Sequence, residues 1–203
     1  HVIEPADSLA MAADRLASGD LGTRYDGPHV SGELDVLARS FNHMADALDE
    51  RTSQLEYLIY HDSLTGCYNR LYFDHLLPTF DDESKLPITF VLADVNGMKQ
   101  VNDLLGQEAG DQLIKMVAEI IEREVGQEGI ILRWGGDEFL VVMLNAQRRA
   151  GLRLASRVRK AVGELSIGPA AVASIALGAS TRISLTQTVS ETIQRAEGRM
   201  FRN

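Results

Sequence analysis

The sequence is poor in cysteine, in long apolar runs and in positive charge. Its 203 residues include one cysteine, Cys67, so no disulfide can form within the chain and nothing indicates an oxidising compartment. No run of about 18 apolar residues occurs, which excludes a membrane-spanning helix within this stretch. Acidic residues outnumber basic ones, 29 against 20, and the net charge of −9 argues against a nucleic-acid partner. What is present, 45% hydrophobic and 24% charged residues, is typical of a globular protein of one or two domains.

The first sixty residues carry most of the negative charge and a long helical pattern. They hold 11 acidic and 4 basic residues, whereas residues 61–203 hold 18 and 16. A short helix is predicted between Pro5 and Gly19. A second, from about residue 33 to 60, has a heptad pattern formed by Leu37, Phe41, Met44, Leu48, Arg51, Leu55 and Leu58. One alternative is a single amphipathic helix that packs against the domain of its own chain. Two short helices that bury only narrow apolar stripes cannot form a core alone, however, so a parallel dimer is favoured.

Carboxylates follow two apolar segments of the second part. The first pair of carboxylates lies within Arg133-Trp134-Gly135-Gly136-Asp137-Glu138-Phe139. This stretch predicts a β-hairpin whose turn is the glycine pair. Because glycine permits close backbone approach and paired carboxylates hold metal, this tip is predicted to hold a metal-bound phosphate, with a plain exposed turn as the alternative. The other segment, residues 87–93, ends on Asp94, which is interpreted as a metal ligand or a helix cap.

The order of elements from residue 87 onward predicts an α+β or α/β domain. The patterns indicate strand, helix, helix, strand, strand, helix, strand and a last helix. We expect a central mixed β-sheet flanked by helices, which should cover one face. The helix predicted at about 148–162 is rich in arginine, and these arginines are interpreted as its solvated face.

The first fifty residues resemble a HAMP domain. The resemblance rests on Pro5, Gly19-Asp20-Leu21, Glu33-Leu34 and Leu37-Ala38-x-x-Phe41-Asn42-x-Met44. It implies a helical, parallel coiled-coil homodimer over residues 1–50, continued by a coiled-coil linker over residues 51–61. It also implies a transmembrane helix just before Val2 in the parent protein, absent from this chain. The chain would then be the cytoplasmic portion of a bacterial inner-membrane protein.

Residues 62–203 resemble the GGDEF domain, the diguanylate cyclase family. The matching motifs are Asp62-x-Leu64-Thr65-Gly66-x-x-Asn69-Arg70, Asp94-x-Asn96-x-x-Lys99-x-x-Asn102-Asp103, Gly110-Asp111, Gly135-Gly136-Asp137-Glu138-Phe139 and Ser174-Ile175-Ala176-Leu177-Gly178. The family condenses two GTP molecules into cyclic di-GMP and two pyrophosphates, on a fold like the nucleotidyl cyclase and polymerase palm. The resemblance therefore implies a diguanylate cyclase that is regulated through a HAMP relay from a membrane sensor.

The GGDEF resemblance also implies a role for each motif residue. Two Mg²⁺ or Mn²⁺ ions per active site would be held by Asp94, Asp137 and the Val95 carbonyl, and Asp137 and Glu138 would be catalytic. The substrate GTP would be bound by Lys99, Asn102, Gln107, Asp111, Gly135 and Gly136.

The sequence departs from the family pattern at several places, among them Cys67, which replaces a usual leucine. Gln107 replaces the usual histidine, so weakened substrate contact is expected. Gly126 and Gly129 replace the Arg-x-x-Asp pair that binds product in many members, so no product-inhibition site is expected. A family lysine would fall one residue past Asn203, which implies that the domain continues further. The alternatives are a non-enzymatic GTP or cyclic di-GMP receptor and a purely structural signalling dimer; the intact Asp94, Asp137 and Glu138 favour the enzyme.

Overall fold

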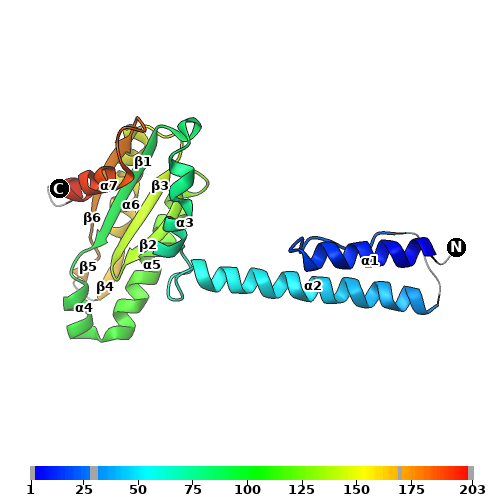
Figure 1. Ribbon diagram of the computed structural model, residues 1–203. Coiled ribbons are helices and arrows are strands. Elements are labelled where there is room, and N and C mark those ends of the chain that lie inside the picture. Colours follow the sequence, from blue (N-terminus) through cyan, green and yellow to red (C-terminus); the bar gives the residue numbers. More distant parts are fainter. Residues whose placement is uncertain (1–2, 28–31, 169–170, 201–203) are drawn as a thin grey trace. The chain divides into compact units, whose positions relative to one another are not determined.

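The computed structural model describes residues 3–27, 32–168 and 171–200 of the chain (Figure 1). These residues form two compact units, His1–Ile59 and Tyr60–Asn203. In the part of the chain that the structure describes, every helix is too short or too polar to cross a membrane.

The first unit contains two helices, α1 (Ile3–Ala17) and α2 (Glu33–Tyr60). The polypeptide that follows α1 is fixed along α2 by polar contacts. Asn42 of α2 accepts from the Tyr25 backbone N–H at 2.7 Å and donates to the Tyr25 carbonyl at 3.1 Å. Arg24 donates to Asp46 at 2.7 Å. Phe41 of the predicted heptad is buried within this unit, whereas Leu37, Met44 and Leu48 remain exposed.

The second unit contains a four-stranded sheet in the order β2-β3-β1-β6, with β1 at Ile88–Val95, β2 at Ile130–Gly135, β3 at Glu138–Met143 and β6 at Ile175–Arg182. Helices and antiparallel strands together confirm the α+β class. The prediction of a mixed sheet is wrong, because each of the three pairings is antiparallel. β2 does run in the same direction as β1, but the hairpin places β3 between them.

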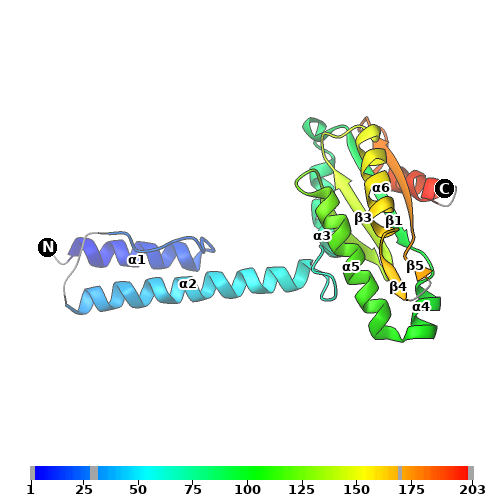
Figure 2. The ribbon, with the colours of Figure 1, turned by 180° about the vertical axis from the view of Figure 1, so that it is seen from behind.

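Helices cover both faces of this sheet, which corrects the prediction that they cover one (Figures 1 and 2). The helices α5 (Gln107–Val125) and α6 (Arg148–Val162) pack on the face that includes Val91 and Ala93. The helices α3 (Arg70–Phe80) and α7 (Val189–Met200) pack on the face that includes Phe90 and Leu92. The reason is that β1 is apolar on both sides, as a strand buried between two layers must be.

The remaining elements are short. The helix α4 (Met98–Leu105) follows β1 and leads directly into α5, and the 3₁₀ turn η1 (Glu83–Lys85) precedes β1. A separate two-stranded sheet is formed by β4 (Ser166–Gly168) and β5 (Ala171–Val172).

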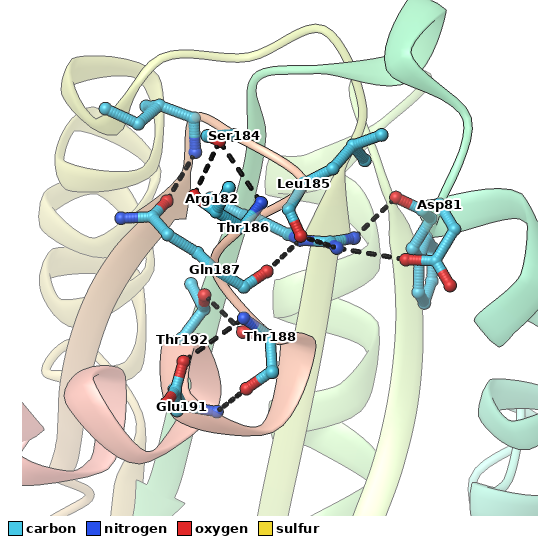
Figure 3. A network of polar contacts seen from close by, with 11 residues as sticks. Asp81, Arg182, Ser184, Leu185, Thr186, Gln187, Thr188, Glu191 and Thr192 are labelled. Carbon is cyan, nitrogen blue, oxygen red and sulfur yellow. Dashed lines mark hydrogen bonds and ion pairs between the residues drawn. The ribbon is translucent and has the colours of Figure 1, made fainter.

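A buried arginine holds the turn between β6 and α7 (Figure 3). The Arg182 guanidinium, 3% exposed, donates to the carbonyl oxygens of Phe80 and Gln187 at 2.6 Å each and to the Asp81 carboxylate at 2.9 Å. These bonds join the end of α3 to the end of β6. The first turn of α7 is closed by a capping box, in which Thr188 accepts from the Glu191 N–H at 3.1 Å and Glu191 accepts from the Thr188 N–H at 3.2 Å.

Candidate active site

The tip of the β2–β3 hairpin lies one residue later than predicted. Gly135 pairs directly with Glu138, so the turn consists of Gly136 and Asp137 rather than of the glycine pair. A register shift between Arg133 and Gly135 accounts for the difference, because the bulge takes up one residue before the turn. Asp137 is therefore at the very tip of the hairpin.

The backbone of this turn does not require Gly136. Its φ angle is not among the positive values found in the described chain, and a Cβ built on it would meet no atom within 4 Å. The missing side chain therefore leaves open space above the tip, which is what a ligand approaching the backbone needs.

Strand pairing brings the predicted carboxylates together. Asp94 near the end of β1 lies opposite Glu138 at the start of β3, and the Val95 N–H donates to the Asp137 carbonyl at 3.0 Å. Asp94, Asp137 and Glu138 are each half-buried, and Val95 is buried. Three acidic side chains, from β1, the hairpin turn and β3, thus share one small region.

Electrostatics at this cluster favour a bound cation. Burial raises the pKa of the Asp94 carboxyl, and the nearby Asp137 carboxylate raises it further. Burial likewise raises the pKa of Glu138, with added repulsion from Asp94, Asp137 and Glu197, against which Arg70 acts in the opposite direction. No group of three or more His, Cys, Asp or Glu side chains among the described residues is arranged to hold a metal ion. The donors available are carboxylate and carbonyl oxygens, the kind that Mg²⁺ and Mn²⁺ prefer.

The predicted substrate residues lie at the corner between α4 and α5. Gly97 and Gly106, with φ of +75° and +87°, precede α4 and α5 respectively. Four of the predicted residues are exposed at this corner: Lys99 and Asn102 on α4, and Gln107 and Asp111 on α5. A Cβ at Gly110 would overlap the side-chain oxygen of Asn102, so the Asn102 side chain lies across α5 at that glycine. The absence of a side chain at Gly110 thus lets the Asn102 side chain pack against α5.

An ion pair fixes the hairpin tip, and its role was not predicted. The Arg133 Nη1 donates to both oxygens of Asp62, at 2.9 and 3.1 Å. The same guanidinium donates to the Gly136 carbonyl, from Nη2 at 2.7 Å and from Nε at 3.1 Å. Burial raises the pKa of Asp62, but hydrogen bonds from Thr65 and Arg133 outweigh burial and hold that pKa below its usual value. Both residues stand in motif segments noted from the sequence, and their opposite charges were the available signal.

Arg70 is a second residue without a predicted role. Its guanidinium carbon lies 4.7 Å from the centre of the Trp134 ring, a cation–π contact, and Trp134 in turn packs edge-on against Phe73. Because Trp134 directly precedes the two glycines, this contact ties α3 to the hairpin.

Two family models match this chain. The model described as "Diguanylate cyclase, GGDEF domain" matches residues 59–203, and the model described as "HAMP domain" matches residues 1–50. The chain is 33% identical over 138 residues to the probable diguanylate cyclase DgcT of Escherichia coli, covering 68% of this chain and 30% of the relative. It is 25% identical over 195 residues to diguanylate cyclase A of Treponema denticola, covering 94% and 52%. The chain thus spans about half or less of the length of these curated relatives.

Solved structures share the fold. The coiled coil and GGDEF domain of DgcB from Caulobacter crescentus, in complex with c-di-GMP, aligns with a TM-score of 0.74 at 21% identity, covering 84% of this chain and 93% of that one. The diguanylate cyclase SiaD from Pseudomonas aeruginosa, in complex with its activator SiaC, aligns with a TM-score of 0.66 at 23% identity, covering 97% and 74%.

Proposed function

Because the chain belongs to the GGDEF-domain diguanylate cyclase family over residues 59–203 and carries a HAMP domain over residues 1–50, as its motifs predicted, we propose that it condenses two GTP molecules into cyclic di-GMP and two pyrophosphates. The observation that carries the proposal is the meeting of Asp94, Asp137 and Glu138 at the hairpin tip. A structural signalling domain would have no need of a repulsive cluster of acidic residues.

The proposed cofactors are two Mg²⁺ or Mn²⁺ ions per active site. Asp94, Asp137 and the carbonyl of Val95 would hold them. When bound, such ions polarise phosphate oxygens and neutralise developing charge. The chain itself would orient the reacting groups: Asp137 would accept the proton of the ribose 3′-hydroxyl. Glu138, a carboxyl whose pKa is raised by burial, would support the metal and phosphate region.

The proposed substrate contacts divide between the corner and the hairpin. Asn102 and Asp111 would bind the donor and acceptor groups of guanine, which adenine cannot match. Lys99 would bind a phosphate, and the backbone at Gly135 and Gly136 would close over the triphosphate. Gln107 keeps a hydrogen-bonding group where the family has histidine, so a weakened contact is expected.

Turnover would require two chains. One catalytic unit binds one GTP, and a two-fold symmetric ring needs two half-sites facing each other. We propose a homodimer through the HAMP domain (residues 1–50) and a coiled-coil linker (residues 51–61), with the cyclase domain at residues 62–203. In support, a 500 Å³ apolar groove lies between α1 and α2 in the single chain, lined among others by Leu9, Leu34, Leu37 and Met44. HAMP domains occur in membrane-linked signalling proteins, and we propose that this chain is the cytoplasmic part of one.

The test is to incubate the protein with GTP and Mg²⁺ or Mn²⁺ and to identify the nucleotide products. Cyclic di-GMP and pyrophosphate are expected, and Asp137→Asn should abolish both. The matched control is Glu119→Gln, which removes an exposed carboxylate of α5 and should leave turnover unchanged. Absence of cyclic di-GMP with either ion, at protein concentrations high enough to populate dimers, would refute the proposal.

A further inference from the structure

The first residue of α3, Arg70, is a cation at a fixed point of the second unit. Its backbone position is set by the preceding residue, Asn69, which caps the helix. The Asn69 side chain accepts from the Tyr72 N–H at 3.1 Å, and the Asn69 N–H donates to the Tyr60 carbonyl at 2.8 Å. Arg70 itself is exposed, so a solvent-accessible guanidinium is attached to a well-anchored helix start.

The guanidinium of Arg70 is oriented by stacking. Its central carbon lies 4.7 Å from the centre of the Trp134 ring, and that ring packs edge-on against Phe73 at 4.9 Å. A guanidinium that covers an aromatic ring uses its flat face for the contact and keeps the N–H donors at its edge for other partners. Within the part of the chain that the structure describes, no ion pair engages Arg70. The edge of this guanidinium is therefore available to an anion.

Arg70 lies on the same face of the sheet as the catalytic carboxylates. Alternate residues of a strand point to the same face, so Asp94 shares the face of the buried Leu92. Glu138 is directly opposite Asp94 and points to that face as well. Trp134 packs against the same core cluster, which α3 and α7 cover. Consistent with this placement, the charge of Arg70 lowers the pKa of Glu138, against the burial and repulsion that raise it.

The proposed contacts to guanine lie on the other side of the strand ends. Asn102 and Asp111 belong to α4 and α5, which pack on the opposite face of the sheet, α4 through Val101. A GTP molecule whose base lies at that corner and whose reacting phosphate lies at Asp94 would extend across the end of β1. Because the base and the terminal phosphates are opposite ends of a nucleotide, the terminal phosphates would then reach the face that carries Arg70.

The charge of the site requires a cation at this end. The carboxylates of Asp94, Asp137 and Glu138 together with a triphosphate carry more negative charge than a pair of divalent ions neutralises. Lys99, the other proposed phosphate ligand, belongs to α4 on the side of the base. When pyrophosphate departs, further negative charge develops on its oxygens, and arginine binds phosphate oxygens with two parallel N–H donors. Arg70 supplies such a group on the side of the terminal phosphates.

We infer that Arg70 binds the terminal phosphates of GTP and stabilises the pyrophosphate as it leaves. In the reaction, the 3′-oxygen of the facing GTP bonds to the α-phosphorus, and Asp137 accepts the hydroxyl proton. The bond from that phosphorus to the oxygen bridging the β-phosphate breaks, and pyrophosphate leaves with the electron pair, held by N–H donors of Arg70. Stacking on Trp134 orients the guanidinium before substrate arrives, which lowers the entropic cost of binding. The inference rests on the proposed function in taking GTP as the substrate.

The experiment compares nucleotides that differ only in their phosphates. The probes are GMP and a GTP analogue with a methylene group between the α- and β-phosphates, which cannot release pyrophosphate. Trp134 is the only tryptophan of the chain, so its fluorescence in the parent reports whether a ligand reaches Arg70. Affinities of the parent, Arg70→Met and Arg70→Lys are compared by calorimetry, because both substitutions alter the surroundings of the ring. The matched control is Arg153→Met, at an exposed arginine of α6, and circular dichroism verifies that each variant folds.

We expect the analogue, and not GMP, to change the fluorescence of the parent. Arg70→Met should weaken binding of the analogue about tenfold or more and leave GMP unaffected, whereas Arg70→Lys should lose less and Arg153→Met nothing. Equal losses for GMP and the analogue would assign Arg70 to the fold of the site and overturn the inference. Unchanged affinity for the analogue would leave Arg70 as a packing partner of Trp134 and equally refute it. The proposed cyclase fails separately, if the parent forms no cyclic di-GMP, since these binding measurements require no turnover.

Discussion

At Gly136 the fold tolerates a side chain, whereas the proposed binding of GTP does not. Its φ angle is not left-handed and its Cβ position is empty, so Gly136→Ala should change the free energy of unfolding by less than about 0.5 kcal/mol. A methyl group there would stand where the triphosphate is proposed to lie, and the KM for GTP should rise about tenfold. Chemical denaturation and GTP kinetics measure the two effects.

A control for that substitution is Gly126→Ala at the end of α5. The space around it is also empty, but its φ of +54° and ψ of −125° suit glycine alone, so the variant should lose about 1–3 kcal/mol of stability. Its KM for GTP should not change. An unchanged KM in Gly136→Ala would mean that the tip does not contact substrate.

Asp94 is expected to destabilise the ion-free protein. It lies opposite Glu138, and burial and mutual repulsion raise the pKa of both carboxyls. Between the ordinary and the raised pKa, the folded state binds more protons than the unfolded state. The contribution of these groups to stability is therefore full below the ordinary pKa and is lost as the pH rises through the raised pKa. Asp94→Asn should raise the free energy of unfolding near pH 7 by about 0.2–1 kcal/mol while abolishing turnover.

Thermal unfolding in a chelator, repeated across pH, tests this expectation. The advantage of Asp94→Asn should shrink as the pH falls and the carboxyls of the parent become protonated. Adding Mg²⁺ should raise the melting temperature of the parent and not that of the variant. A variant less stable than the parent at pH 7 would contradict the expected repulsion, and a variant stabilised by Mg²⁺ as much as the parent would contradict the metal assignment.

At the scale of elements, one guanidinium connects the segment after α2 to the hairpin. Arg133 bonds to Asp62 and to the Gly136 carbonyl, next to the proposed metal ligand Asp137. The pair is partly buried, with side chains 17% and 22% exposed, so its partners depend on each other. We predict that movements of the proposed linker are transmitted to the candidate site through this contact, because Asp62 follows the end of α2 by two residues.

We therefore predict strong coupling between Asp62→Asn and Arg133→Met. Each should lower kcat about tenfold by loosening the tip, and the double variant should be little worse than either. The coupling energy should be about 0.5–3 kcal/mol in a double-mutant cycle of unfolding. Arg123→Met, which removes a surface arginine paired with its neighbour Glu124, is the control and should change neither quantity. Additive effects of the two substitutions would show that the pair does not act as one contact.

At the scale of the whole molecule, the proposed dimer requires the exposed heptad residues of α2. Leu48 is 42% exposed and Leu55 60% exposed in the single chain, although both belong to the apolar repeat. Leu48→Asp or Leu55→Asp should weaken dimerisation, so specific activity should fall steeply when the protein is diluted. Gln54→Asp places the same charge on the same helix at a polar position and should behave like the parent. Specific activity of Leu48→Asp that stays constant on dilution would exclude this seam as the dimer contact.

Inhibition by the product, cyclic di-GMP, depends on the turn that contains Gly126 and Gly129. From the motif spacing, we expect the family's product-binding arginine and aspartate to correspond to Gly126 and Gly129. A Cβ at Gly129 would lie 2.8 Å from the Val142 carbonyl. Side chains at this turn would need a different backbone. We predict no high-affinity site for cyclic di-GMP there, as calorimetric titration of the nucleotide-free protein will test. Submicromolar binding that persists in Asp94→Asn/Asp137→Asn and is lost on Gly129→Asp would contradict the prediction.

The sequence by itself determined the family, limited the fold to the α+β or α/β class, and predicted the residues of the candidate site. These depend on local features: residue spacing, apolar periodicity and motifs in order along the chain, such as Gly135-Gly136-Asp137-Glu138. Only the tertiary structure decided how distant segments meet. It placed Asp94 opposite Glu138, inserted β3 between β1 and β2, covered both faces of the sheet, and joined Asp62 to Arg133, 71 residues away. The physical reason is that periodicity shows which residues are buried, whereas strand order and helix packing depend on long-range contacts that no local pattern encodes.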